Sequence, residues 1–496
     1  MIKETDFKQI PVAEFKTPFE TSLDPKNRWV RLANVIPWEK LAEIYTRNFR
    51  KDYGRHATKS QIIIGAIIIN HFLKSSDEDT IELIKENPYL QYFLGLSGFT
   101  HKPVFHPTLF VAIRKRLGLE TFEQMTGEFI SAVNALKVSS SKGKKKVVAD
   151  TVPEDQKEKS NQGQLILDAT VAPADIKYPT DLDLLNTSRE QSEKLIDRLS
   201  ASLEGVEKPR TYRRVARKEY LLIIKQKKKD HKKIRKAVRK QLNYLRRNIK
   251  SINMLLDICR DREQLVEYKN LRIFWIIQEV YRQQKEMYDQ ISHQTDDRIV
   301  SVSQPHVRPI VRGKSGKEVE FGAKISASLV NGYIYLDRMS WDAFNENKDL
   351  KKQVENFKER FGHYPEVVIG DKIYGSRENR DFLKENHIRF SGKALGRPPA
   401  VTEENAAEVK KQRKRYRKEQ GIRNGIEGKF GEGKRKYQLE RVKARTARTS
   451  ESWIATVFLV MNLACWLRDH FFAFLQGGLQ AGEWPRFLSG WAIFLS

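Results

Sequence analysis

One short stretch near the C-terminal end, residues 423 to 434 with the sequence RNGIEGKFGEGK, places a lone carboxylate between two cations. Arg423, Glu427 and Lys434 stand four and then seven residues apart, so on an α-helix they point to nearly the same face. A carboxylate on such a face can hold a divalent metal ion while the cations hold phosphate oxygens. The alternative is an exposed, ion-paired helix face, which is the usual fate of such charges.

The same stretch is a near match to a phosphate-binding loop, because residues 428 to 434 read G-x-x-x-x-G-K. That loop requires Ser or Thr as the next residue and a buried strand before it. Here Arg435 comes next, and the preceding run KKQRKRYRKEQG is too charged for a buried strand. We therefore expect no nucleotide site. Each glycine costs a helix roughly 1 kcal/mol relative to Ala, so either packing holds this helix or the helix begins late in the stretch.

Two further carboxylates belong to apolar runs that are typical of strands. Asp168 interrupts the run LILDATVAP, where a buried carboxylate is costly unless it is paired or bound to a metal; a turn or edge position is the alternative. Asp371 follows the run EVVIG, at the carboxyl end of the expected strand, which is a common position for an active-site residue. Three carboxylates from separate elements can hold two Mg²⁺ or Mn²⁺ ions about 4 Å apart, as phosphoryl transfer on DNA requires.

The segments around these residues predict an α/β core. Alternating strands at 319–330 and 333–339 flank Asn331-Gly332, a strong hairpin signal. A helix over 347–362, a strand at 366–370, a helix over 376–387, a short strand at 388–392 and a last core helix over 453–467 are predicted to follow.

Residues 1–137 read as helices separated by turn signals, at 37–49, 60–74, 76–95, 106–118 and 120–136. Such a compact helical unit commonly binds duplex DNA. The fourth helix carries Arg114, Lys115 and Arg116, which are candidates for contact with a groove or with the DNA backbone. A solvated basic face is the alternative.

The formal net charge of +28 over 496 residues indicates a polyanionic partner, either nucleic acid or an anionic membrane surface. Residues 208–250 alone carry 19 Lys or Arg against two acids. Around them, residues 187–295 read as a long helical hairpin, with an apolar seam from Ile234 to Cys259 and a basic outer face. DNA backbone contact is favoured over a solvated surface, and the candidate contacts are Lys228, Lys232, Arg235 and Arg239.

Other features limit the class of protein. The two cysteines lie far apart and lack ligand spacing, so neither a zinc site nor a disulfide framework is supported. The N-terminus has no apolar signal region, and the apolar runs at 62–73 and 453–467 are shorter than the roughly 20 residues that span a bilayer. We expect a soluble, intracellular protein with no membrane contact.

Several stretches together carry a family resemblance: LILDATVAPADIKYPTDLDLLN, QPHVRPIVRGK, EFGAKISAS, WDAFNE, IGDKIYGSRENR and RNGIEGKFGEGKRKYQL. With them the chain resembles, over nearly its whole length, a bacterial insertion-sequence transposase of the DDE class. In that family the final Glu lies in the pattern Tyr-x2-Arg-x3-Glu-x6-Lys. Arg423, Glu427 and Lys434 match this pattern, whereas Gln420 stands at the Tyr position.

The resemblance implies roles for particular residues. Asp168, Asp371 and Glu427 would be the catalytic ligands of two Mg²⁺ or Mn²⁺ ions. The phosphate or DNA contacts would be Arg423, Lys434, Arg308, Arg312 and Lys314. The 203 positions between the two aspartates would hold the basic helices as an insertion. The 56 positions from Asp371 to Glu427 are too few for the large insertion that some relatives carry there. The part of this chain that would grip an unpaired end base is therefore open. Trp341 is a candidate for that role, and an ordinary core tryptophan is the alternative.

The expected fold is an α/β RNase H-like core, a mixed sheet with flanking helices, plus an all-helical N-terminal domain and a long helical insertion. The expected domains are 1–137 (helical, DNA-binding), 138–164 (linker), 165–186 with 296–470 (RNase H-like core), 187–295 (basic helical insertion) and 471–496 (C-terminal tail).

The resemblance implies a transposase that cleaves double-stranded DNA at the terminal inverted repeats of its element and transfers the strand to target DNA. It also implies a homodimer in the synaptic complex and a bacterial cytoplasmic, nucleoid-associated location. Two alternatives stay open, a catalytically inactive, transposase-derived DNA-binding protein and a nuclease without strand transfer.

Overall fold

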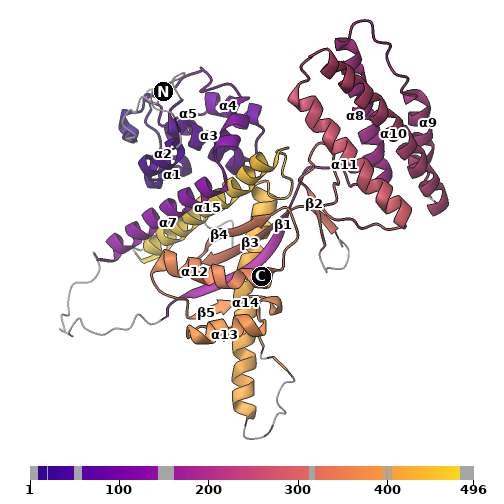
Figure 1. Cartoon of the computed structure of the whole chain (residues 1–496). Helices are drawn as coiled ribbons and strands as arrows, with labels where there is room; N and C mark the ends of the chain where they lie inside the picture. The colour runs from indigo at the N-terminus through magenta and orange to yellow at the C-terminus, as the bar shows by residue number, and fades with distance from the viewer. Residues whose placement is uncertain are drawn as a thin grey trace.

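The computed structural model describes residues 9–18, 21–47, 49, 58–142, 161–228, 230–311, 319–393, 395–396, 402 and 405–480. Figure 1 shows three parts: a group of N-terminal helices, a central sheet with helices around it, and a separate helical bundle beyond one end of the sheet.

Short helices form the N-terminal part, as the turn signals predict. Ser76 caps one of them by accepting a hydrogen bond from the Asp79 N–H at 3.0 Å. The single helix predicted over 76–95 is two helices, because Asn87 caps a new helix that starts at Pro88. The helices are α1 Arg28–Val35, α2 Trp38–Thr46, α3 Ser60–Leu73, α4 Asp77–Glu86, α5 Pro88–Phe93, α6 Leu109–Arg116 and α7 Leu119–Lys142, after a 3-10 turn at Val12–Glu14.

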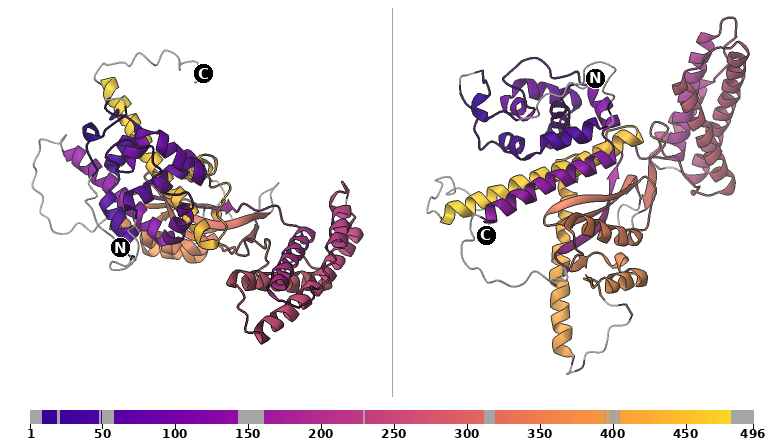
Figure 2. Two further views of the ribbon diagram at one scale, coloured as in Figure 1. Left: turned by 90° about the horizontal axis from the view of Figure 1, so that it is seen from above. Right: turned by 60° about the vertical axis from the view of Figure 1, so that its left-hand side comes forward.

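These helices share one hydrophobic core with the sheet. The long helix α15 (Ala447–Gln480) lies beside α7 and also contacts α3 and α6 (Figures 1 and 2). Its Trp453 ring packs edge-on against His71 of α3, with ring centroids 4.6 Å apart. The apolar core is therefore continuous from the N-terminal helices through α15 to the strands.

The sheet is mixed, with β1 at its centre. Strand β3 pairs antiparallel with β1 on one side and with β2 and β4 on the other, while β5 and then β6 continue parallel to β1. Asn331 and Gly332 both have positive φ, at 51° and 85°, and form the predicted hairpin turn. The strands are β1 Gln164–Pro173, β2 Arg308–Val311, β3 Val319–Val330, β4 Tyr333–Ser340, β5 Val367–Ile369 and β6 Arg389–Phe390.

Helices cover both faces of the sheet and one of its edges. Helix α12 (Leu350–Phe361) lies on one face, where Gln353 donates to Ser326 Oγ at 3.2 Å, and α13 (Arg377–Glu385) packs beside it. Helix α14 (Ala406–Lys436) crosses the opposite face, against β1, β3 and β5. Asn462 of α15 donates to the Ile334 carbonyl and accepts from its N–H, both at 2.8 Å, so α15 satisfies the free backbone groups of strand β4.

The bundle contains four helices, not the predicted hairpin. They are α8 Asp181–Ser202, α9 Arg213–Ile224, α10 His231–Asp261 and α11 Tyr268–Gln290. The predicted seam of α10 is largely buried, but it packs mainly against α8, with α9 and α11 alongside. Fully buried Arg189 of α8 contacts Glu193 and donates to Gln241 of α10 at 3.1 Å, so a polar pair also lies inside the bundle.

Three predicted boundaries change. The bundle begins at Asp181, six residues before the predicted 187, and α7 runs to Lys142, inside the predicted linker 138–164. Helix α15 runs through Gln480 into the predicted tail; residues 143–160 and 481–496 lie outside the described residues. The part of α15 from Ala447 to Asp469 is long and apolar enough to cross a membrane, but 89% of its most apolar window is buried inside the protein, as in a core helix.

Candidate active site

Three of the residues singled out from the sequence meet where α14 crosses β1. Arg423 Nη1 lies 3.5 Å from Asp168 Oδ2, and Arg423 Nη2 lies 2.7 Å from Glu427 Oε1. The Asp168 and Arg423 side chains are 15% and 18% exposed, whereas Glu427 is 48% exposed. The guanidinium therefore bridges an inner and an outer carboxylate.

The glycine-rich stretch is helical because its other face packs on the protein, as expected. Ile426 and Phe430 are buried, and a side chain at Gly433 would come within 2.9 Å of Met461 Sδ of α15. The burial of this face offsets the helix-weakening effect of the glycines. Arg423 and Glu427 are thus positioned by a rigid element.

Asp371 follows the strand next to β1. The parallel pairing aligns Ile166 with Ile369, so Asp168 and Asp371 each stand two residues beyond the same aligned pair. Neighbouring strands are about 4.8 Å apart, which brings the two backbones close together. The Asp371 carboxylate accepts a hydrogen bond from the Lys372 N–H at 2.6 Å, and Asp371 is exposed.

The electrostatics distinguish Asp168 from a surface carboxylate. Burial raises the pKa of Asp168 to about 6, because the charged form loses solvation. The Ala169 N–H, which donates to Asp168 at 2.9 Å, and the Arg423 charge oppose this rise, while the Glu427 charge adds to it. An additional positive charge near Asp168 would therefore be favourable.

The carboxylates do not form a ready metal cage. Among the residues that the structure describes, no group of three or more His, Cys, Asp or Glu side chains is arranged to hold a metal ion. Arg423 occupies the space between Asp168 and Glu427, so two of the expected ligands contact a guanidinium.

One acidic residue near this point was not among the residues selected from the sequence. Glu346 lies in the turn Glu346–Asp349 before α12, is 20% exposed, and pairs with Lys324 Nζ of β3 at 2.9 Å. Its charge also contributes to the raised pKa of Asp168. The run WDAFNE, which ends at Glu346, was the signal available in the sequence, but no spacing ties it to Asp168.

The other predicted phosphate contacts are more dispersed. Lys434 lies on α14, two turns beyond Glu427. Arg308 begins β2 and pairs with Gly322 of β3, which in turn pairs with Pro173 of β1. Pro173 is five residues beyond Asp168 on β1, so Arg308 lies farther along the sheet than Asp168. Its Nε lies 3.7 Å from Asp342 Oδ1. Arg312 and Lys314 are outside the described residues.

Trp341 is half-buried and tied to its surroundings. Its ring packs edge-on against His306 at 4.4 Å, and its Nε1 donates to Glu451 Oε1 at 3.0 Å. These contacts favour the alternative of a core tryptophan.

The prediction that Arg114 contacts DNA is wrong. Its side chain is only 6% exposed and donates to both carboxylate oxygens of Asp77, at 2.7 and 2.8 Å. It also stacks over Trp453, 5.0 Å from the ring centroid. Arg114 therefore holds α6 to α4 and α15 and is not available to DNA, whereas Lys115 and Arg116 are exposed.

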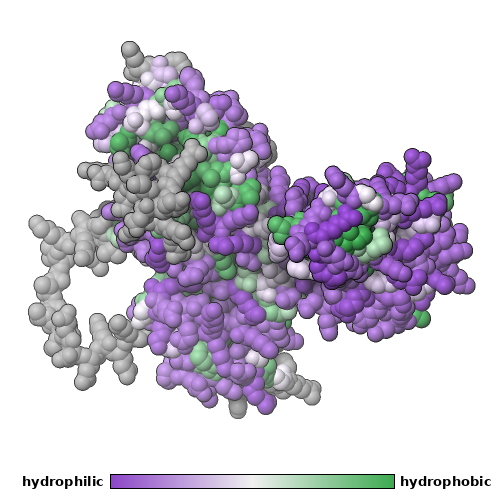
Figure 3. Space-filling view, turned by 45° about the horizontal axis from the view of Figure 1, so that its top comes forward, coloured by the Kyte–Doolittle hydropathy of each residue, from purple (hydrophilic) through white to green (hydrophobic). Residues whose placement is uncertain are grey.

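The predicted basic contacts of the bundle lie on its surface. Lys228 precedes α10, and Lys232, Arg235 and Arg239 are on α10; all four are exposed. Figure 3 shows hydrophilic side chains over most of the visible face of the bundle, at the right of the picture.

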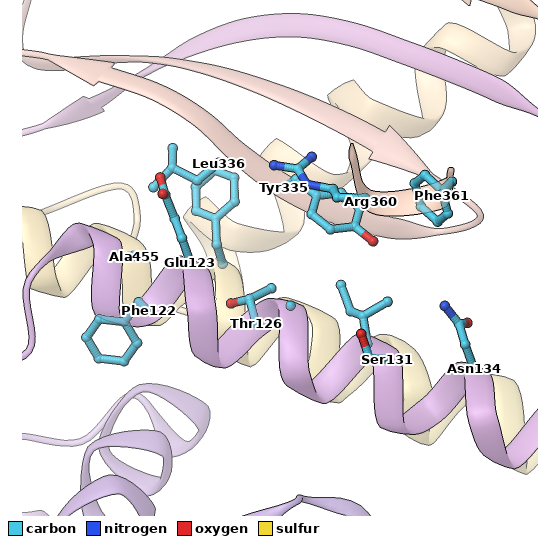
Figure 4. Close-up of a pocket in the computed structure, with 13 residues that line it drawn as sticks. Phe122, Glu123, Thr126, Ser131, Asn134, Tyr335, Leu336, Arg360, Phe361 and Ala455 are labelled. Carbon is cyan, nitrogen blue, oxygen red and sulfur yellow. The ribbon is translucent and has the colours of Figure 1, made fainter. Parts of the chain in front are cut away.

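A pocket of about 130 Å³ lies away from these carboxylates, between α7, α15, α12 and β4 (Figure 4). On the sheet side of the pocket, Arg360 lies over the Tyr335 ring, 4.3 Å from the ring centroid. On the other side, Ser131 and Asn134 of α7 line the pocket. None of the predicted catalytic residues lines this pocket.

Comparisons with known proteins match both ends of the chain. Residues 368–464 match a family model described as a transposase DDE domain, and this range contains Asp371, Arg423 and Glu427. Residues 17–116 match a second model, described as "Transposase domain (DUF772)". A Rhizobium meliloti protein named "Uncharacterized protein ORF8 in nfe locus" is 28% identical over 204 residues, which cover 41% of this chain and 87% of that protein.

No solved structure matches the chain. The chain is thus similar to a transposase domain near its N-terminal end and to a transposase DDE domain near its C-terminal end, which is consistent with an insertion-sequence transposase.

Proposed function

We propose that the protein cleaves DNA at the terminal inverted repeats of its own element and joins the freed strand to target DNA. The observation that carries this proposal is the bridge from Asp168 through Arg423 to Glu427, with Asp371 at the matching position of the next parallel strand. Cleavage and strand transfer are both in-line displacements at phosphorus, which depend on positioned charge more than on covalent chemistry by the protein.

An RNase H-like core is part of the proposal. In its support, the six-stranded sheet has the order β2, β3, β1, β5, β6, with β4 also paired to β3; β3 is antiparallel to β1, β2 and β4, and β5 and β6 are parallel to β1. The proposal assigns the bundle α8–α11 as an insertion after the first strand, as its place between β1 and β2 suggests.

The donor set suits a hard divalent cation. Carboxylate oxygens are the ligands that Mg²⁺ and Mn²⁺ prefer, and we propose that Asp168, Asp371 and Glu427 hold two such ions. Bound ions would activate the attacking oxygen and stabilise the leaving oxygen. The raised pKa of Asp168 fits a site that is completed by positive charge.

The cations have separate tasks in this proposal. Arg423 would exchange one carboxylate for a phosphate oxygen when DNA binds, since a guanidinium can hold either partner in two-point contact. Lys434 would contact a phosphate further along the same helix.

The proposed grip on DNA lies outside the carboxylate site. Lys115, Arg116 and the exposed cations of α10 would hold the phosphate backbone, and Arg308 would contact DNA beside β2. We further propose a homodimer in the synaptic complex and action in the cytoplasm on nucleoid DNA.

The test is plasmid excision in Mg²⁺ with the DNA that flanks this reading frame as donor, comparing wild type with Asp371→Asn. Asp381→Asn is the matched control, because Asp381 is exposed on the neighbouring helix α13. We expect wild type and the control to excise and Asp371→Asn to lose excision while still binding the end DNA. Full wild-type activity in EDTA would overturn the metal assignment.

The second candidate function is DNA binding without catalysis. It is favoured by the position of Arg423 between two of the three carboxylates. Wild-type protein that retards end DNA but never cuts it would establish this alternative. Cleavage without joined product on a target plasmid would instead indicate a nuclease.

A further inference from the structure

The first part of α14 is a basic helix with no buried residue, and among the described residues Lys393 contacts it, over the Tyr416 ring at 5.4 Å from the centroid. Residues 406–418 carry seven Lys or Arg and a single acid, Glu408. All seven cations are exposed, and the buried residues of α14 begin only at Glu419. Figures 1 and 2 show this part of the helix projecting below the sheet. We call residues 406–418 the basic arm.

Among the residues that the structure describes, no carboxylate forms an ion pair with a cation of the arm. Like charges at helical spacing repel, and a helix of 13 residues is marginal without packing. The arm continues from the packed half of α14, and Glu419 at its base pairs with Arg389 Nη2 of β6 at 2.6 Å. The described structure thus holds a concentrated positive charge in an extended position, where a polyanion can reach it.

The arm and the candidate site belong to one continuous helix. We propose that the basic arm binds the phosphate backbone of the DNA duplex that adjoins the phosphate attacked at Asp168 and Glu427. This inference rests on the proposed function, which supplies the DNA. It adds a second backbone contact, on the opposite side of the site from the bundle.

Helical geometry selects one side of the arm. At 100° per residue, Arg413, Arg417 and Lys410 lie within roughly 100° of the direction in which Glu427 points. Lys411, Lys414 and Lys418 lie roughly 140° or more from it. DNA that reaches the exposed Glu427 from solvent would therefore meet the first set, which we call the near stripe, and not the second, the far stripe.

The two stripes allow a matched comparison, because each has three cations with the same spacing of three and four residues. One variant carries Lys410→Gln, Arg413→Gln and Arg417→Gln; the other carries Lys411→Gln, Lys414→Gln and Lys418→Gln. Gln keeps the helix propensity of Lys and Arg, and circular dichroism verifies the helix content. The probe is a duplex with the DNA that flanks the reading frame, bound without Mg²⁺ at several salt concentrations.

We expect the near-stripe variant to bind more weakly and to lower the slope of log K against log salt by about 2 to 3, since each phosphate contact contributes about 0.9. The far-stripe variant should lower the slope by less than about 1. An unrelated duplex should respond in the same way, because backbone contacts carry no sequence information.

A tethered cleavage reagent gives an independent readout. Cys259 and Cys465 are buried, so Gln412→Cys would be the exposed thiol on the arm that takes an iron–EDTA label. Gln412 lies 15 residues before Glu427, or about 22 Å along the helix. We expect backbone cuts about six or seven base pairs from the phosphate that wild type cleaves.

The outcomes separate the two proposals. Equal slopes of log K against log salt for the two stripe variants, or no cuts near the expected position, would overturn the arm contact. If wild type still binds and excises the flanking DNA, the proposed function stands. A wild type that neither binds nor excises the flanking DNA overturns the proposed function itself.

Discussion

Two arginines of this protein each pair with a carboxylate, yet their surroundings differ. Arg114 in α6 is buried and makes a two-point contact with Asp77, beneath the Trp453 ring. Arg423 in α14 lies between Asp168 and Glu427, and Glu427 is about half exposed. The first arginine has all its partners inside the protein, whereas the second has one partner that solvent, and hence DNA, can reach.

The difference shows that the packing around a charged pair decides its use. A buried pair that loses one partner leaves an uncompensated charge, so it is fixed in place. An ion pair with one half-exposed member, such as Glu427, is weaker, and its arginine can exchange that partner. Arg114 therefore serves the fold, and Arg423 is suited to contact a phosphate.

The largest expected effect is on stability at the first arginine. Arg114→Met should lower the free energy of unfolding by about 3 kcal/mol or more, because Asp77 would be left without its buried partner. Urea denaturation measures this loss. The control Lys115→Met changes the next, exposed residue and should stay within about 0.5 kcal/mol of wild type. If Arg114→Met kept wild-type stability but bound DNA more weakly, Arg114 would be a DNA contact and not a structural residue.

The second effect is on activity at the other arginine. Arg423→Met should reduce cleavage of end DNA about 100-fold, since it removes a charged donor from the site where, in the proposed function, phosphate charge develops, with little change in stability. Arg441→Met is the control, because Arg441 also pairs with an aspartate, Asp175 at 2.7 Å, although its side chain is more exposed than that of Arg423. Equal activity of the two variants in a Mg²⁺ cleavage assay would remove Arg423 from the site.

Local patterns predicted those parts of the fold that depend on neighbouring residues. The Asn331-Gly332 turn, the strand that contains Asp168 and the helix that carries Arg423 and Glu427 each follow from spacing within a short segment. The register of β1 and β5, which aligns Asp168 with Asp371, depends on pairing across about 200 residues. Local patterns do not predict that alignment; the family resemblance implies that the two aspartates act together, and the structure gives their register.

Residues whose role depends on distant partners are not predicted correctly by local patterns. Arg114 stands four residues after Phe110 and three before Leu117, both buried, so the helical period did place it on the apolar face. Its partner Asp77 comes from another helix, and no local pattern indicates that pairing. Glu346 is similar, because only the folded sheet brings it near Asp168.

The smallest expected effect concerns pH at the first arginine. His71 is fully buried beside Trp453, and burial together with the Arg114 charge lowers the pKa of His71 to about 3. The unfolded chain binds this proton near pH 6.5, so the contribution of His71 to stability is complete above that pH and is lost as the pH falls toward 3. Between pH 7 and 5.5 the loss should be about 1.3 kcal/mol.

Stability curves of wild type and His71→Leu at these two pH values measure that contribution, because the variant lacks the titrating group. The difference in unfolding free energy between pH 7 and 5.5 should shrink in His71→Leu and stay unchanged in His231→Gln, which alters an exposed histidine. Arg114 faces His71 from α6 and is itself paired with Asp77, so Arg114→Met should raise the pKa of His71, but burial is the larger cause of the low pKa and the loss between pH 7 and 5.5 should stay close to that of wild type. An acid dependence that survives His71→Leu in full would mean that other groups, such as the carboxylates around Arg423, set the response to pH.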